Sequence, residues 1–175
     1  MFRQDDASTR RHSRREDVDA AQRRKLIDRY KQGAREVRGA VAGATDAELD
    51  ARPRPGEWTA REIVHHLPDS EMTSALRLRK LLVEDHPVLE GYDENAFARV
   101  LHYQARPIDG ALDLLEATRR VTAELLDRMS DEDWRREGTH TESGRYTCET
   151  WLEIYAAHAH DHAEQIRRSR SAGTR

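Results

Sequence analysis

The chain has only one cysteine, Cys148, among its 175 residues. A single thiol excludes an internal disulfide framework and a zinc site built from several cysteines. No apolar run approaches the roughly 20 residues that a membrane-spanning helix needs. The basic N-terminus, MFRQDDASTRRHSRRED, lacks the apolar segment of a secretory signal. These absences predict a protein of the reducing cytoplasm, without a membrane partner.

The sequence also lacks a large excess of charge of one sign, because its 30 Lys and Arg residues nearly balance its 33 Asp and Glu residues. The net charge of −3 gives no general reason to expect a nucleic-acid partner. Aromatic residues make up only 6% of the chain, whereas charged residues make up 36%. This composition favours a helical protein with long solvated faces over a β-sandwich or a barrel.

Four long segments have apolar residues at helical spacing. We expect these helices at about 17–44, 59–85, 107–129 and 147–168. Four helices of similar length, joined by loops of which one or two are long, predict an all-α four-helix bundle with short extra helices in the connections. The bundle domain should span residues 17–168, between disordered tails at 1–16 and 169–175.

Shorter patterns locate the ends of these helices and the features between them. TDAE at 45–48, TARE at 59–62 and the start of SDEDW at 130–134 have the spacing of helix caps. Pro68 lies inside the second long helix and should kink it or open it locally. A short helix is expected at 93–99, and the polar stretch RREGTHTESGRYT could hold a small hairpin.

The stretch YAAHAHDHAEQI, near the end of the fourth helix, contains three histidines at alternate positions. Each residue turns a helix by about 100°, so His158 and His162 share one face and His160 points roughly the other way. Trp151 and Ile166 belong to the apolar face that contains the first two. We therefore expect His158 and His162 to face the bundle interior, with His160 outside the site.

His66 occupies a position on the apolar stripe of the second helix, whereas His65 is rotated away and should be peripheral. A lone inward histidine is most often a hydrogen-bonded core residue, but three inward imidazoles favour a divalent metal. Neutral imidazoles suit zinc, nickel, copper or iron, and three ligands leave a coordination position open for chemistry. The candidates to hold the second ring nitrogens are Asp69, Tyr155 and Gln165.

Three segments together resemble the DinB/YfiT superfamily of four-helix-bundle metalloproteins: GEWTAREIVHHLPDSEM, HPVLEGYDENAF and WLEIYAAHAHDHAEQI. The resemblance runs from about Val18 to Arg168. It implies that one divalent metal ion, zinc or nickel, is bound by His66 of the HHLxDSE element and by His158 and His162 of the HxxxH element. The sequence departs from the family at Pro68, where small residues are common.

The resemblance also implies an activity. Members are described as metal-dependent hydrolases, and one branch contains S-transferases that use the thiols bacillithiol or mycothiol. They are commonly cytoplasmic homodimers. We expect a thiol S-transferase that conjugates a small-molecule thiol to an electrophile, with metal-dependent hydrolysis as one alternative and a non-enzymatic, dimeric metal-binding stress protein as another.

The residues themselves favour transfer over hydrolysis. Hydrolysis by metal-activated water usually needs a general base, but Glu71 is rotated off the His66 face and Asp161 is poorly aimed. Transfer needs no protein thiol, which fits a chain whose single cysteine, Cys148, is more simply a small buried residue than an activated one. The long connections containing Tyr92 and His140 could cover the metal pocket.

Overall fold

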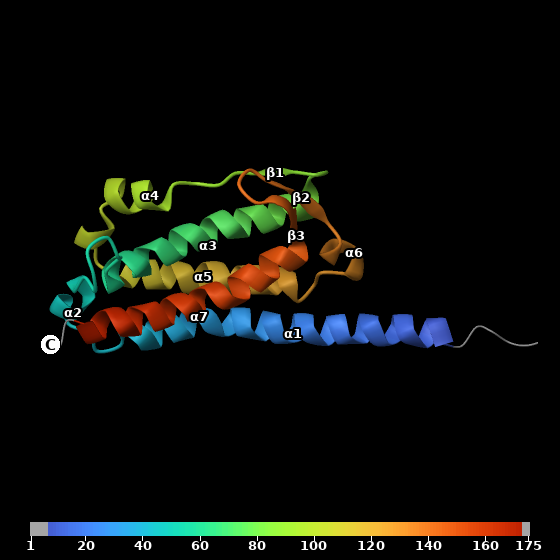
Figure 1. Cartoon of the computed structure of the whole chain (residues 1–175), viewed down its shortest axis with the longest axis horizontal. Coiled ribbons are helices and arrows are strands. Elements are labelled where there is room, and N and C mark those ends of the chain that lie inside the picture. Colours follow the sequence, from blue (N-terminus) through green and yellow to red (C-terminus); the bar gives the residue numbers. More distant parts are fainter. Residues whose placement is uncertain (1–6, 173–175) are drawn as a thin grey trace, which may run out of the picture.

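The computed structural model of the protein describes the backbone of residues 7–172 and the side chains of residues 20–171. Four long helices form a bundle (Figure 1). They are α1 (Ala7–Val41), α3 (Ala60–Val83), α5 (Asp109–Leu126) and α7 (Cys148–Ala172). Helices α1 and α3 lie diagonally across the bundle from each other, and each packs against both α5 and α7. The predicted four-helix bundle is confirmed.

Short elements fill the connections between these helices. They are α2 (Asp46–Asp50), α4 (Glu94–Val100), a 3₁₀ turn (Tyr103–Ala105), α6 (Asp131–Trp134) and the strands β1 (Val88–Leu89), β2 (Glu137–His140) and β3 (Gly144–Thr147). The expected hairpin is β2–β3, which pairs antiparallel, while β1 adds a parallel edge strand that the sequence did not suggest. Helix α4 and the small sheet lie beyond α3, on the side away from α1 (Figure 1).

The predicted caps are present. Thr59 and Glu62 form a reciprocal capping box at the start of α3, with the Glu62 amide donating to Thr59 Oγ1 at 3.2 Å and the Thr59 amide to Glu62 Oε2 at 2.8 Å. Equivalent boxes begin α2 and α6. Pro68 does not interrupt α3, which is continuous from Ala60 to Val83. The cap therefore fixes where α3 begins, and hence the face on which its histidines lie.

Both ends of the domain differ from the prediction. Helix α1 begins at Ala7, so residues 7–16 are helical where a disordered tail was expected. Residues 7–32 contain neither glycine nor proline, which allows a helix to continue. Helix α7 extends to Ala172, and Arg170 Nη1 donates to the Ala40 carbonyl at 2.6 Å, near the end of α1. The remaining parts of the two predicted tails lie outside the described residues.

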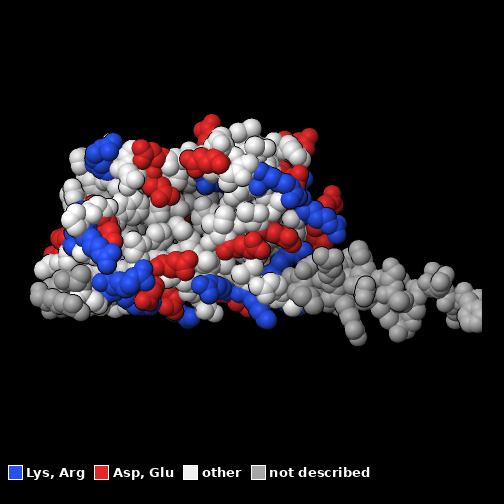
Figure 2. Space-filling view, viewed as in Figure 1, with Lys and Arg blue, Asp and Glu red and all other residues white. Residues whose placement is uncertain are grey.

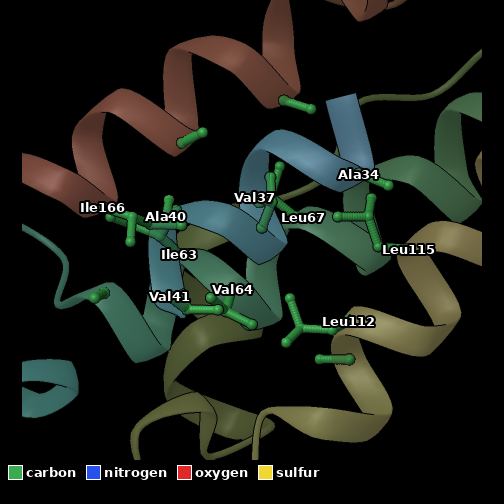
Figure 3. Close-up of a cluster of buried hydrophobic side chains, with 14 of the residues drawn as sticks. Ala34, Val37, Ala40, Val41, Ile63, Val64, Leu67, Leu112, Leu115 and Ile166 are labelled. Atoms are coloured by element: carbon green, nitrogen blue, oxygen red, sulfur yellow. The ribbon is translucent and has the colours of Figure 1, made fainter. Parts of the chain in front are cut away.

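The apolar core consists of two clusters, one toward each end of the bundle. The first is built around α1, α3 and α5, with Val37, Leu67 and Leu115 among its members (Figure 3). The second surrounds Trp151 and includes Leu78. Each of the four helices contributes residues to both clusters, and the boundary between the clusters lies near the middle of the bundle.

A buried polar group occupies that middle layer. The Glu71 carboxylate is fully buried and pairs with Arg119, with Nη1 and Oε2 separated by 3.2 Å. The Tyr30 hydroxyl also donates to Glu71. Arg119 further donates from Nε to the Tyr30 carbonyl at 3.1 Å and from Nη2 to the Tyr155 carbonyl at 2.6 Å. The pair thus joins α3 and α5 and holds the backbones of α1 and α7.

This layer corrects the expected buried face of α5. Val121, which helical spacing of apolar residues alone would assign to the core, is 48% exposed, whereas Arg119 is 2% exposed. The buried positions step through Leu112, Leu115, Arg119, Thr122 and Leu126. Buried residues therefore recur every three or four positions along α5, as on a regular buried helix face, and one of them is the charged Arg119.

Charges of both signs are interspersed on the face of the molecule shown in Figure 2. Ion pairs also join neighbouring helices, such as that of Arg38 on α1 with Asp113 and Glu116 on α5. No helix in the described part of the chain is both long and apolar enough to cross a membrane.

Candidate metal centre

The structure brings His66, His158 and His162 together between α3 and α7. One nitrogen from each ring can be chosen such that all three lie within 4.8 Å of one another. The ring centres are 5.4 Å apart for His66 and His158, 5.0 Å for His66 and His162, and 4.5 Å for His158 and His162. Residues more than ninety positions apart in the sequence therefore meet at one point.

Burial keeps these imidazoles neutral. Burial first, and the neighbouring histidines second, lower the pKa of His66 to about 3 and that of His158 to about 2. Burial also lowers the pKa of His162, against the opposing effects of Gln165 and Asp161. A neutral imidazole has a lone pair available for a metal ion, so no proton competes for it near neutral pH.

Gln165 fixes the tautomer of His162. The Gln165 side-chain oxygen can only accept, so His162 Nδ1, which lies 2.8 Å away, carries the proton. The lone pair of His162 is therefore on Nε2. This contact matches the role that was expected of Gln165.

Asp69 and Tyr155 behave differently from Gln165. The Asp69 carboxylate accepts a hydrogen bond from the Tyr103 hydroxyl. Tyr155 stacks edge-on to His158, with ring centres 5.6 Å apart, and so forms a wall of the site. Trp58 forms the opposite wall, 4.9 Å from His66. Tyr103 comes from the connection before α5, and no pattern in the sequence pointed to it.

A divalent metal ion fits this arrangement. Tetrahedral bonds of about 2.0–2.1 Å would place the ligand nitrogens about 3.3 Å apart, which small ring movements can reach from the present spacing. Nδ1 of His66 and Nδ1 of His158 are buried and have no hydrogen-bond partner among the described residues. Buried polar atoms without partners are costly, and coordination of a shared cation is one way to satisfy imidazole nitrogens.

The other histidines of the two helices point elsewhere. His160 Nε2 donates to the Arg29 carbonyl of α1 at 2.9 Å, as its rotation from the HxxxH face requires. His65 is only 2% exposed, so the expectation that it is peripheral was wrong. Its Nε2 donates to the Arg106 carbonyl at 3.2 Å, and its ring lies 5.7 Å from that of Tyr103. His65 thus anchors the connection before α5.

Cys148 has no place in this chemistry. It is the first residue of α7 and is fully buried. Burial raises the pKa of its thiol to about 12. The thiolate, which is the reactive form, is therefore scarce near neutral pH, and Cys148 is a small core residue.

Replacing Gln165 with alanine should weaken metal binding about 10-fold to 100-fold, the usual effect of losing a group that orients a metal-binding histidine. The change frees Nδ1 of His162 and allows the other tautomer. A competitive titration against a chromophoric chelator measures the affinity. Gln32→Ala on the exposed face of α1 is the matched control. Equal affinities for the two variants would show that Gln165 does not orient the ligand.

The metal-free protein should lose stability as the pH falls below about 6.5. The unfolded chain takes up protons on His66 and His158 there, whereas the folded protein does so only near pH 3 or 2. The folded state consequently binds fewer protons, and each ring costs about 1.4 kcal/mol per pH unit. Denaturant titrations at about pH 6.5 and about pH 5 in the presence of a chelator measure the loss.

The variant His66→Leu isolates this effect from all other titrating groups. It should lose about 2 kcal/mol less than the unaltered protein over the same pH interval. Identical losses in the two proteins would mean that His66 is protonated in the folded state.

Similar proteins are found over most of the chain. The profile of the DinB superfamily matches residues 29–166. The "Putative metal-dependent hydrolase OB0782" of Oceanobacillus iheyensis is 35% identical over 130 residues, which cover 74% of this chain and 75% of that protein. The "Putative metal-dependent hydrolase YfiT" of Bacillus subtilis is 32% identical over 87% of this chain and 86% of its own.

A solved structure agrees with the fold. The structure of YfiT from Bacillus subtilis superposes with a TM-score of 0.81 and 31% identity, over 85% of this chain and 86% of that one. It is described as a probable metal-dependent hydrolase with an unusual four-helix bundle topology. The region matched by the DinB superfamily, residues 29–166, includes all three histidines.

Proposed function

This chain belongs to the DinB superfamily, and from that premise we propose that it is a metal-dependent thiol S-transferase, which joins a low-molecular-weight thiol to an electrophile. The observation that carries the proposal is the set of three neutral histidines with no protein thiol or carboxylate among them. Such a set holds one divalent ion, zinc or nickel, and leaves a coordination position for a small molecule.

The reaction balances without a redox partner. The thiol loses its proton, its sulfur forms a bond to an electrophilic carbon, and the leaving group departs with the electron pair of the broken bond. A bound divalent metal supplies the lowered thiol pKa that makes sulfur nucleophilic at neutral pH. Bacillithiol or mycothiol is the co-substrate that we propose, in a cytoplasmic homodimer.

The residues around the site support this role. His162 is held in one tautomer by Gln165, which orients its ring. Trp58 and Tyr155 flank the histidines on two sides and limit the access of water. The open coordination position is left for the thiol, and the proton that the thiol releases passes to solvent or to the leaving group, because Glu71 is already paired with Arg119.

Hydrolysis is the second candidate, and the names of the relatives favour it. It calls for a base that takes a proton from water. Asp161 is exposed on α7, Glu71 is bound by Arg119 and Tyr30, and the Asp69 carboxylate accepts from Tyr103. Asp69 is the least committed of these, so a hydrolase would depend on it.

A conjugation assay separates the candidates. The zinc-loaded or nickel-loaded protein is expected to join bacillithiol or mycothiol to monochlorobimane, with Cys148→Ala as active as the unaltered chain. Hydrolysis of ester and amide substrates without thiol, abolished by Asp69→Asn, would instead identify a hydrolase. The absence of both activities in metal-loaded protein would support a non-enzymatic metal-binding role.

A further inference from the structure

A second group of polar side chains continues the line of the three histidines along the same two helices. On α3, Ser70 follows His66 by four residues and Arg77 follows it by eleven, which keeps all three on one side of the helix. On α7, Tyr155 precedes His158 by one turn. Helices α3 and α7 pack against each other, and Tyr155 contacts His158 on one side while having Arg77 as a hydrogen-bonding neighbour.

The guanidinium of Arg77 is only partly used by the protein. Its Nη2 donates to the Glu90 carbonyl, which fixes the position of the group. Its Nε is buried and has no hydrogen-bond partner among the described residues. Because a buried guanidinium N–H without a partner is costly, an acceptor is expected at that edge of the group.

The Tyr92 hydroxyl is a second buried donor without a hydrogen-bond partner in the described part of the chain. Burial raises the pKa of Tyr92, and the nearby Ser70 side chain opposes this as a polar neighbour. Burial likewise raises the pKa of Tyr155, with Ser70 and Arg77 as its hydrogen-bonding neighbours. The Arg77 guanidinium and the three hydroxyls are therefore neighbours, and the Tyr155 ring in turn contacts His158.

The small sheet holds Tyr92 in this position. The Thr141 amide donates to the Leu89 carbonyl at 2.9 Å, and the Gly91 amide to Thr141 Oγ1 at 3.0 Å. A side chain at residue 91 would meet the Glu142 carboxylate within 2.4 Å, so glycine allows this close approach. The ring of Tyr92 also packs on Phe97 of α4, with ring centres 4.7 Å apart. These contacts fix the position of the Tyr92 hydroxyl.

We propose that Arg77, Tyr92, Ser70 and Tyr155 form a subsite that binds a carboxylate of the substrate next to the three histidines. The unpaired Nε–H of Arg77 can donate a charge-assisted hydrogen bond to one oxygen of a carboxylate, and the Tyr92 hydroxyl can donate to the other. One arginine balances one negative charge. A more highly charged group such as a phosphate would be repelled by Asp69 and Glu94, which lie close to Tyr92.

This inference rests on the proposed function, because it assigns a recognition group to a substrate of the same site. It implies that the thiol or the electrophile bears a carboxylate a short distance from its reacting atom. Ser70 is one helical turn, about 6 Å along the axis, from His66. A substrate that binds both sites therefore needs a spacer of a few carbon atoms.

The test uses two series of thiols that differ only at the far end. One series consists of ω-mercaptocarboxylates of increasing chain length, and the other of the ω-mercaptoalcohols of equal length. Calorimetry of the metal-loaded protein measures the affinity for each thiol. The absorption spectrum of the cobalt-loaded protein reports independently whether sulfur reaches the metal.

At the best chain length, the carboxylate is expected to bind at least about tenfold more tightly than the alcohol. Arg77→Met should abolish this advantage and leave the metal content unchanged. Tyr92→Phe, which removes a single hydroxyl and no packing, should reduce it several-fold. Arg79→Met is the matched control, because Arg79 lies on the same helix but donates to the Ala75 carbonyl and to Thr122.

Equal affinities for the two series in the unaltered protein, or an advantage that survives both Arg77→Met and Tyr92→Phe, would overturn the subsite. An unchanged cobalt spectrum with every thiol would instead argue against the proposed transferase. In that case the calorimetric comparison of carboxylates with alcohols still decides whether the subsite exists.

Discussion

Replacing Arg119 with methionine should lower the free energy of unfolding by about 3–5 kcal/mol, since it leaves the buried Glu71 carboxylate without its cation. Glu71 and Arg119 are 0% and 2% exposed, and water cannot replace the lost partner. The change also removes donors from the Tyr30 and Tyr155 carbonyls. Denaturant titration should show the loss, and the Tm should fall by roughly 10 °C.

Two further variants make this prediction specific. Arg120→Met alters an exposed arginine on the same helix and should change stability by no more than about 0.5 kcal/mol. The double variant Glu71→Leu/Arg119→Met removes both buried charges and should recover much of the loss. If Arg119→Met is as stable as Arg120→Met, the buried pair does not hold the middle of the bundle together.

Replacing His158 with alanine should weaken metal binding by more than about 100-fold, because loss of a ligand exceeds the effect of losing a group that only orients one. His66→Ala and His162→Ala should behave alike, since each removes one of the three nitrogens. Chelator competition measures the affinities. The proteins should remain folded without metal, because the two hydrophobic clusters do not depend on the histidines.

His160→Ala is the matched control, two residues from His158 and from His162. Its ring donates to the Arg29 carbonyl on α1, so its loss should leave metal affinity within about twofold of the unaltered protein. Similar losses for His160→Ala and His158→Ala would contradict the assignment of faces on α7. Unfolding of all three ligand variants would favour a structural metal.

Helical periodicity predicted that His66, His158 and His162 would lie together, because their positions follow simple rules. His158 and His162 are four residues apart on a face defined by large apolar neighbours, and His66 occupies an apolar position on another helix. The meeting of the two helices then followed from the bundle. Gln165 was also foreseen, since a residue three positions after His162 lies above it on the same helix.

Periodicity failed where a charged residue belongs to the core. Arg119 breaks the apolar pattern of α5, so a stripe drawn only through apolar residues would include the exposed Val121 and omit the buried Arg119. Glu71 was judged only by its angle to His66, and its partner on α5 is invisible in a local pattern. Asp69 had the right spacing to reach His66, but Tyr103, from a distant connection, accounts for its hydrogen bond. Such pairings depend on tertiary packing that no short stretch encodes.

X-ray absorption of the purified protein tests the central claim most directly. We expect one zinc or nickel ion per chain, bound by three imidazole nitrogens at about 2.0–2.1 Å for zinc, together with a light atom from solvent or a sulfur when a thiol is added. The same spectrum should be obtained from His160→Ala. A protein without tightly bound metal, or a spectrum in which a carboxylate replaces one of the three imidazoles, would contradict the site formed by His66, His158 and His162.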